Sequence, residues 1–364
     1  MKKGKVIAIL AASFIVGLLG SLFFLSRNGL FLKPKEKLAF DIPEAESLQK
    51  TNYNILLLGY GGEGHDGGSL SDVLMLVNFN PEKKKVKVIS IPRDLWVDIP
   101  VRSDASEKYK INSAFAIGSS DILYPLKEPK YKGEKGAGQL AKDVVSKVVD
   151  QPVDYFLAVD FGNFRRIIDL LGGVEVLVPV SFEDRFYPVK GLENETCGFS
   201  SEKIAEFHQK YSGFDLEKQF YCRYETLSFD AGKTKMNGEV ALKFVRSRHS
   251  STHGGDFARS ERQKALLLAL SDKLTSWAAI KSAREIFTEL STLVKTDITL
   301  ETFGGFFLLV GDPRTYEISF VGLSTENVLL DSRSTNGQYI LVPKNGENNW
   351  KVVWDFVESE IGAN

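Results

Sequence analysis

The chain has 364 residues, more than a typical single domain, and its 43% hydrophobic and 26% charged content is that of an ordinary globular protein. One large α/β domain plus an anchor fits this length. The formal net charge of -1 excludes a generally basic nucleic-acid binder, so an anion site must be a local concentration of arginines. Two cysteines are too few for a disulfide framework or a four-ligand structural zinc site.

The N-terminal segment indicates a membrane anchor. Three lysines among residues 1–5 precede an uncharged apolar run over residues 6–25. At 1.5 Å per residue, a helix of this length spans roughly 30 Å, the thickness of a bilayer core. The positive flank predicts a cytoplasmic tail of residues 1–5, with the rest of the chain on the outer side of the cell membrane.

Two other interpretations of this run are disfavoured. A cleaved signal peptide would have a shorter apolar core and a small-x-small cleavage site, which Phe23, Phe24 and Leu25 do not provide. A buried core helix would have a polar face, and this run has none. Residues 26–52, with prolines and mixed charges but no apolar periodicity, are expected to form an extracytoplasmic tether.

A folded domain is expected over residues 53–364. The expected strands cover residues 54–58, 73–79, 86–91, 155–160, 174–178 and 340–343. The expected helices cover residues 138–149, 164–171, 238–244 (capped by Asn237), 260–280, 283–294 and 300–310, and a last one starts at residue 350. This alternation of strands and helices predicts a layered α/β fold.

Residues 181–229 interrupt this pattern and are expected to be an irregular insertion. They contain Cys197 and Cys222, which in an extracytoplasmic domain would stand where disulfides persist. Either a disulfide that staples the insertion or two free buried cysteines is compatible with the sequence.

Arg93 and Asp94 follow the expected strand over residues 86–91, and Pro92 ends its ladder of hydrogen bonds. The carboxyl ends of strands are where open α/β sheets bind their ligands, so both residues are candidates for a functional site. Taken alone, the two residues are more simply explained as a surface ion pair.

A second basic pair, Arg246 and Arg248, follows the short helix that ends near residue 244. If the chain is extended there, residues two apart point to the same side, and two crowded guanidinium groups repel unless an anion lies between them. Arginine also presents a planar fork of donors that matches phosphate oxygens. The pair therefore indicates an anion site, with a solvated basic loop as the alternative.

A third cluster lies at the start of the expected helix over residues 260–280. Arg259 and Gln263 are four residues apart and share one helix face, and Ser260 with Gln263 fits a capping box. Free N–H groups at a helix N-terminus favour an anion, which supports a binding role for both side chains. Arg262 is expected on the solvated face of this helix.

The glycine-rich segment over residues 60–69 has neither the ending of a P-loop nor the spacing of a dinucleotide fingerprint. Its acidic and imidazole groups, and the carboxylate of Asp72 just after it, are candidate ligands for a divalent ion beside a pyrophosphate. No histidine stands beside a nucleophile elbow, so covalent catalysis is not expected.

Taken in order, these segments resemble the LytR–CpsA–Psr family of bacterial envelope glycopolymer transferases, from about residue 53 to the C-terminus. The matching motifs are Asn54-Ile55-Leu56-Leu57-Leu58-Gly59, Ser71-Asp72, Ser90-Ile91-Pro92-Arg93-Asp94, Lys110-Ile111-Asn112-Ser113-Ala114-Phe115, Val159-Asp160-Phe161, Asp169-Leu170-Leu171-Gly172-Gly173-Val174, Asn237-Gly238-Glu239 with Arg246 and Arg248, and Asp256-Phe257 with Arg259, Arg262 and Gln263. Each motif is weak alone, whereas the ordered set is specific.

The resemblance implies a layered α-β-α domain with a central mixed β-sheet and a phosphotransferase activity. Such proteins move a glycopolymer from a polyprenyl-pyrophosphate lipid in the membrane to a peptidoglycan hydroxyl during cell-wall assembly. By analogy, the expected catalytic residues are Arg93, Asp94, Arg246 and Arg248. The residues expected to bind the pyrophosphate are Lys110, Arg259 and Gln263, and Asp72 is expected to hold magnesium. Asp94 either orients Arg93 or helps to deprotonate the acceptor hydroxyl.

One position departs from the family's pattern. Where the family commonly carries an aspartate two residues after Gly59, this chain has Gly61. Either Glu63 or Asp66 replaces that carboxylate from a longer loop, with Asp66 the preferred metal ligand, or metal binding differs.

Two alternatives to a transferase share the same arginines. One is a non-catalytic protein that binds lipid pyrophosphates or anionic wall polymers, and the other is a polyprenyl-pyrophosphate hydrolase. A nucleic-acid partner is not expected because of the N-terminal apolar run and the nearly neutral charge.

Overall fold

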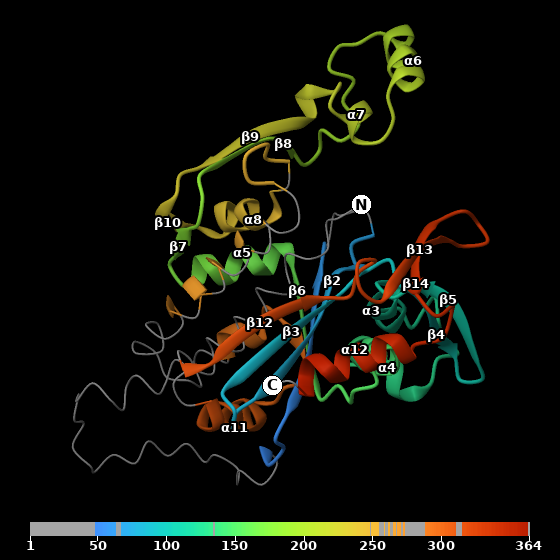
Figure 1. The fold of residues 1–364 in the computed structure, drawn as a ribbon, viewed down its shortest axis with the longest axis vertical. Coiled ribbons are helices and arrows are strands. Elements are labelled where there is room, and N and C mark those ends of the chain that lie inside the picture. The colour runs from blue at the N-terminus through green and yellow to red at the C-terminus, as the bar shows by residue number, and fades with distance from the viewer. Residues whose placement is uncertain are drawn as a thin grey trace.

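The computed structural model describes residues 48–62, 67–133, 135–247, 249–254, 288–310 and 315–362, with residues 258, 261–262, 265–266, 268–270 and 272–273 (Figure 1). The predicted anchor over residues 6–25, most of the tether and most of the predicted helix over residues 260–280 lie outside this set. Within the described set, no helix combines the length and the apolar character needed to cross a bilayer.

A six-stranded mixed sheet forms the centre of the fold, in the order β11-β6-β1-β2-β3-β12. Its strands are β1 (Tyr53–Tyr60), β2 (Ser71–Asn80), β3 (Lys85–Ile91), β6 (Tyr155–Asp160), β11 (Lys295–Thr296) and β12 (Glu317–Gly322). β1 is parallel to β6 and β3 to β12, whereas β2 is antiparallel to both of its neighbours. The expected strands over residues 73–79 and 86–91 correspond to β2 and β3, which form an antiparallel hairpin.

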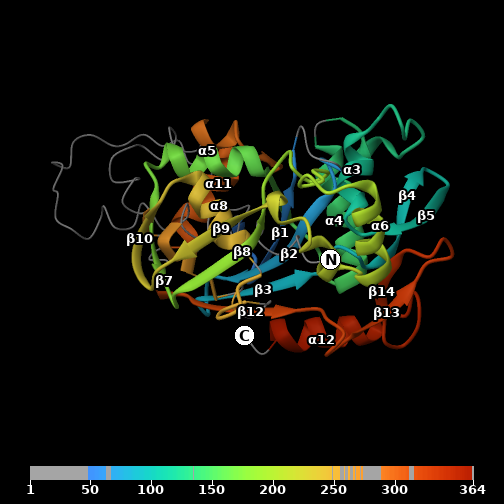
Figure 2. The ribbon, with the colours of Figure 1, turned by 90° about the horizontal axis from the view of Figure 1, so that it is seen from above.

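Helices cover both faces of this sheet, because both faces of its inner strands are apolar. In β1 the side chains alternate: Ile55 and Leu57 belong to one buried cluster, and Leu56 and Leu58 to the other. The first cluster includes side chains of α5 (Phe161–Leu170), α8 (Gly238–Arg246) and α11 (Leu300–Val310). The second includes side chains of α3 (Ser113–Ser119), α4 (Gly136–Val149) and α12 (Lys351–Gly362). Figure 2 shows the sheet between these two sets, which confirms the predicted layered α/β fold.

Four two-stranded ribbons surround the central sheet, and several of their strands were not predicted. The pairs are β4 (Trp96–Arg102) with β5 (Ala105–Lys110), β7 (Val174–Val178) with β10 (Gly232–Met236), β8 (Phe182–Pro188) with β9 (Tyr224–Phe229), and β13 (Leu329–Arg333) with β14 (Tyr339–Pro343). The predicted helix over residues 283–294 is helical at its described residues 288–291 and stops before β11.

The sequence predicted an irregular insertion over residues 181–229, and this prediction is wrong because the segment contains strands and helices. β8 and β9 form an antiparallel ribbon whose first pair is Phe182 with Phe229. Between the two strands lie α6 (Ser201–Lys210) and the short helix α7 (Phe214–Glu217). Figure 1 shows this arm, residues 182–229, extending away from the body. Its tip was hard to predict because its apolar contacts are aromatic pairs within the arm, such as Phe199 with Phe207, rather than a periodic face.

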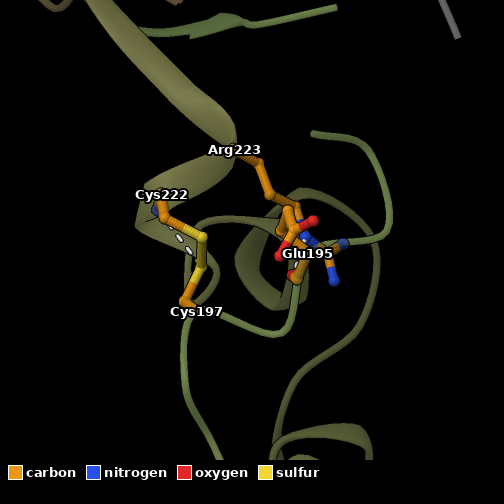
Figure 3. Close-up of a disulfide and its surroundings, with 4 residues drawn as sticks. All are labelled: Glu195, Cys197, Cys222 and Arg223. Atoms are coloured by element: carbon orange, nitrogen blue, oxygen red, sulfur yellow. Dashed lines mark hydrogen bonds between the residues drawn. A yellow bond between two sulfur atoms is a disulfide. The ribbon is translucent and has the colours of Figure 1, made fainter. Parts of the chain in front are cut away.

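A disulfide between Cys197 and Cys222 closes the tip of the arm, so the two cysteines are not free (Figure 3). Beside it, the Arg223 Nε donates a hydrogen bond of 2.7 Å to the Glu195 carbonyl. The disulfide ties the segment before α6 to the segment before β9, two parts of the chain that no sheet joins.

Replacing both cysteines by serine is expected to loosen the arm and leave the central sheet folded. Cys197 and Cys222 are 25 residues apart, and a crosslink of that span stabilises by about 3 kcal/mol through the unfolded chain. Limited proteolysis should therefore cut the double variant between residues 189 and 223 while the wild type resists. Cleavage at equal rates in both proteins would contradict a stapling role.

Candidate active site

Four central strands end or begin at the same edge of the sheet. Tyr60 at the end of β1 is paired with Asp160 at the end of β6 and with Ser71 at the start of β2. Next to β2, β3 ends at Ile91, which faces Leu74. The candidate site residues that follow β1 and β3, namely Asp72 after the glycine-rich segment and Arg93 with Asp94, therefore lie at one edge, as expected for carboxyl ends of strands in an open α/β sheet.

A β-bulge puts Asp72 at this edge. Gly59 pairs with Val73 and Tyr60 pairs with Ser71, which leaves Asp72 as an extra residue without a partner in β1. Such bulges bend a strand and redirect a side chain, often beside an active site. Here Asp72 Oδ1 accepts a hydrogen bond from Arg93 Nη1, across from β3.

Arg93 lies between two carboxylates. Besides its bond to Asp72, its Nε is 3.7 Å from Asp94 Oδ2. The other oxygen of Asp94 accepts a hydrogen bond of 2.6 Å from Lys110 Nζ, at the end of β5. The four side chains are between 13% and 26% exposed, so they are partly withdrawn from water yet accessible to a ligand. The structure thus joins four of the predicted site residues in one ionic network.

Backbone hydrogen bonds fix the segments that carry this network. The Ser71 N–H donates to the Asn112 carbonyl (3.0 Å), and the Asn112 N–H donates to the Arg93 carbonyl (3.4 Å). On the other side, the Leu341 N–H of β14 donates to the Asp94 carbonyl (2.9 Å). The network therefore rests on β2, on the segment between β5 and α3, and on β14.

An open cleft of about 510 Å³ lies beside this edge, between the ends of β1 and β6 and the segment that leads into β11. Tyr60, Asp160 and Lys295 line it, together with Gly68 and Ser69, which come shortly before Asp72. Burial, reinforced by the negative charge of Asp160, raises the pKa of Tyr60 to about 12. Tyr60, which lines the cleft, therefore stays neutral to a higher pH than an exposed tyrosine does.

Asp160 was not among the predicted site residues, although it belongs to a motif that the sequence highlighted. It caps α5: Oδ1 accepts from the Asn163 N–H and Oδ2 from Asn163 Nδ2, both at 2.8 Å. A Cβ added to Gly62 would lie 2.9 Å from the Asp160 Cβ. The segment that carries Gly61 and Gly62 therefore passes directly against this carboxylate.

Arg246 lies near the same corner. It is the last residue of α8 rather than part of an extended segment, so the predicted extended geometry is wrong at this position. Its guanidinium carbon is 4.7 Å from the ring centre of Phe161, the residue after Asp160, and 5.8 Å from that of Tyr187 in the arm. The two rings hold the cation by cation–π attraction and keep its edge accessible.

Two fully buried charged residues clamp the chain that follows Arg246. Asp184 Oδ2 in β8 accepts bonds from Ser247 Oγ (2.7 Å) and from the His249 N–H (3.0 Å). Arg262 Nη2 donates to the Ser247 carbonyl (2.9 Å), and its Nη1 donates to the His253 carbonyl (2.8 Å). The backbone on both sides of residue 248 is therefore fixed from the arm and from the next helix.

The sequence predicted Arg262 on a solvated helix face, and this prediction is wrong. Arg262 is 0% exposed and packs over the ring of Phe182. Four other predicted site residues lie outside the described set, namely Asp66, Arg248, Arg259 and Gln263. In the part of the chain that is described, no group of three or more His, Cys, Asp or Glu side chains could hold a metal ion.

Comparisons with known proteins agree with this architecture. A sequence model of the LytR_cpsA_psr family matches residues 30–351. The polyisoprenyl-teichoic acid–peptidoglycan teichoic acid transferase TagV of Bacillus subtilis is 28% identical over 260 residues, which are 71% of this chain and 52% of TagV. The transferase TagU of Enterococcus faecalis is 24% identical over 254 residues, which are 69% of this chain and 63% of TagU. The chain thus matches between about half and somewhat under two thirds of the length of these relatives.

Solved structures share the fold. The crystal structure of Bacillus subtilis TagV has a TM-score of 0.54 at 23% identity, covering 86% of this chain and 99% of that one. A protein of Streptococcus agalactiae has the same TM-score at 21% identity, covering 86% and 88% of the two chains. At these identities the likeness establishes the mixed α/β architecture alone.

Asp160→Ala is expected to lower the free energy of unfolding by about 1 kcal/mol, because α5 loses its N-cap. Asp160→Asn keeps a cap and should lose no more than a few tenths of a kcal/mol. Urea denaturation of the two variants measures the difference. Equal losses would mean that the charge of Asp160, rather than its cap, stabilises the fold.

Arg262→Ala is expected to cost about 3 kcal/mol of stability, because the buried Ser247 carbonyl and the part-buried His253 carbonyl lose a charged donor and Phe182 loses its packing partner. Arg262→Lys should recover only part, since one ammonium lacks the planar fork that reaches both carbonyls. Urea denaturation is again the measurement. A loss no larger than that of an exposed control, Arg165→Ala, would disprove the clamp.

Proposed function

This chain belongs to the LytR–CpsA–Psr family, and on that premise we propose that it is a membrane-anchored phosphotransferase. Its substrate is a glycopolymer linked through pyrophosphate to a polyprenyl lipid, and its acceptor is a hydroxyl of peptidoglycan. The names of TagV and TagU, polyisoprenyl-teichoic acid–peptidoglycan teichoic acid transferases, support this assignment. The single structural observation that supports it most is the network of Asp72, Arg93, Asp94 and Lys110 beside the cleft.

The charge balance of the network suits an exchange of anions. Arg93 and Lys110 carry two positive charges, which Asp72 and Asp94 balance. A phosphate oxygen can replace Asp72 on Arg93, because a guanidinium binds phosphate and carboxylate oxygens with the same donors. Arg246, held against the ring of Phe161, would add positive charge for the second phosphate, with Arg248, Arg259 and Gln263 as further proposed contacts.

Asp94 acts by orientation in this proposal. Its two oxygens face Lys110 at 2.6 Å and Arg93 at 3.7 Å, so it fixes the positions of both cations. A carboxylate held in this way is better suited to placing donors on a phosphate than to taking a proton from the acceptor. Positioning and neutralisation of developing charge are the main demands of phosphoryl transfer.

Asp72 fits a magnesium ligand. Its carboxylate is 23% exposed and follows closely on Gly68 and Ser69, which line the cleft. Magnesium is usually held by one or two carboxylates together with phosphate oxygens and water, so no larger cluster is required. We propose Asp66 as the second carboxylate, because this chain has Gly61 at the position where the family commonly carries an aspartate. Bound there, magnesium would neutralise charge on the phosphates.

The location of the active site outside the cell membrane is part of the same proposal. The apolar run over residues 6–25 would span the bilayer, and residues 26–52 would tether the domain to it. The disulfide between Cys197 and Cys222 is consistent with an oxidising, extracytoplasmic compartment.

One assay separates the candidate activities. The full chain is incubated with a polyprenyl-pyrophosphoryl saccharide, magnesium and peptidoglycan. Saccharide phosphate joined to the peptidoglycan supports the transferase, whereas free saccharide phosphate would identify a hydrolase. Retention of the lipid without turnover would identify a binding protein.

Arg93→Lys is expected to lower the rate of transfer about 10²-fold, because the charge remains but the planar fork of donors that binds Asp72 in this structure and would bind phosphate oxygens in its place is lost. Arg93→Ala should lower it further. Arg165→Ala, which removes an exposed pair with Glu239, should change the rate by less than about twofold. A rate for Arg93→Lys equal to that of this control would refute the role of Arg93.

A further inference from the structure

The connection between α3 and α4 carries an unusual concentration of exposed apolar side chains. Within five residues, Ile122 is 91% exposed, Leu123 is 76% exposed and Leu126 is 61% exposed. Single exposed apolar residues are ordinary on protein surfaces, but a contiguous group marks an interaction site. We call residues 120–127 the apolar loop.

The apolar loop is held in place by the side chain of Lys127. The side chain of Lys127 is fully buried, and its Nζ donates to the Ile117 and Gly118 carbonyls at 2.7 and 2.8 Å. The same ammonium is 3.2 Å from Asp121 Oδ1, at the start of the loop. A buried cation therefore fastens both ends of the loop to the end of α3. The apolar side chains are exposed because the backbone that carries them is fixed in this conformation.

The surroundings of the loop suit the boundary between lipid headgroups and acyl chains. Lys132 is exposed, and its Nζ donates to the Pro125 carbonyl at 2.5 Å, which places an ammonium at the base of the apolar tip. Tyr124, in the same turn, is half-buried beside it. Apolar tip, phenol and lysine in this order match a lipid surface, where the ammonium meets lipid phosphates.

The position of the loop relative to the active site fits a lipid-linked substrate. α3 begins at Ser113, directly after Asn112, whose N–H bonds to Arg93, and it ends at the apolar loop. Seven helical residues rise about 10 Å. Arg93 would thus lie within reach of a pyrophosphate at the headgroup level of a bilayer that the apolar loop contacts.

We propose that the apolar loop inserts into the outer surface of the bilayer and sets the active site at the level of the lipid phosphates. This inference rests on the proposed function for the identity of the substrate, but contact with the bilayer can be measured without turnover. It adds a second, reversible membrane contact to the predicted anchor.

A fluorescent label on the loop tests the contact. Both cysteines of the chain are joined in the disulfide, so Leu123→Cys offers one thiol for an environment-sensitive nitrobenzoxadiazole label. The full chain is reconstituted in phosphatidylglycerol–phosphatidylethanolamine vesicles. The emission should shift to the blue and be quenched by nitroxide-labelled lipid. The matched control is Leu177→Cys in β7, a site where the native leucine is 63% exposed. In Figure 1, β7 lies across the body from α3, so this label should show neither effect.

The outcomes decide between partners. Quenching by nitroxide lipid at residue 123 alone supports membrane contact. A blue shift without quenching would show that protein covers the loop, either a second copy or another segment of this chain, and would overturn the proposal. Equal quenching at residues 123 and 177 would also overturn it, because proximity to the vesicle rather than insertion would explain both signals.

A second variant links the loop to turnover. Leu123→Asp is exposed, so the fold should be preserved, which thermal unfolding checks. In vesicles its transfer from a long-chain polyprenyl substrate should fall about tenfold, while transfer from a short-chain, water-soluble analogue stays at the wild-type rate. Equal rates for the variant and wild type on the long-chain substrate would contradict the proposal. Failure of the wild type on both substrates would refute the transferase and leave the fluorescence result standing.

Discussion

The pairing of Arg93 with Asp72 is the constraint on which the rest of the site depends. It requires β3 to end next to the start of β2 and requires a bulge that leaves Asp72 out of register with β1. Asp94 and Lys110 then complete a network without net charge that is only partly exposed. In such surroundings charge interactions are stronger than in water, so the network holds Arg93 and Lys110 in place before an anion arrives.

The arm, residues 182–229, belongs to the site as much as to the surface. Its first strand supplies Asp184, which accepts hydrogen bonds from the Ser247 hydroxyl and the His249 N–H on either side of residue 248, and Tyr187, whose ring borders Arg246. Arg262 holds the same backbone from the other side. Buried charges of this kind are costly unless each finds its partners, and here those partners are the segment that carries the second arginine pair. The disulfide closes the tip of the arm, away from this clamp.

Together, the proposals describe an enzyme that meets its substrate at a surface. α3 has the ionic network at its beginning and the apolar loop at its end, so a single short helix relates the phosphate site to the lipid surface. The cleft beside Tyr60 and Asp160 opens on the same edge of the sheet. Because the strands of the sheet fix this edge, the distance between the proposed lipid contact and the proposed active site does not depend on the predicted tether before residue 53.

The sequence alone determined the family, the layered α/β fold and the identity of Arg93, Asp94 and Lys110, because periodic apolar strands and local motifs are encoded in neighbouring residues. It did not reveal the bulge at Asp72, the burial of Arg262 or the helical position of Arg246. These features arise from contacts between residues far apart in the chain, such as Asp184 with Ser247, which no local pattern contains. Tertiary structure therefore decided which arginines lie partly exposed at the proposed site and which hold the backbone, since burial and partners, not residue type, separate the two roles.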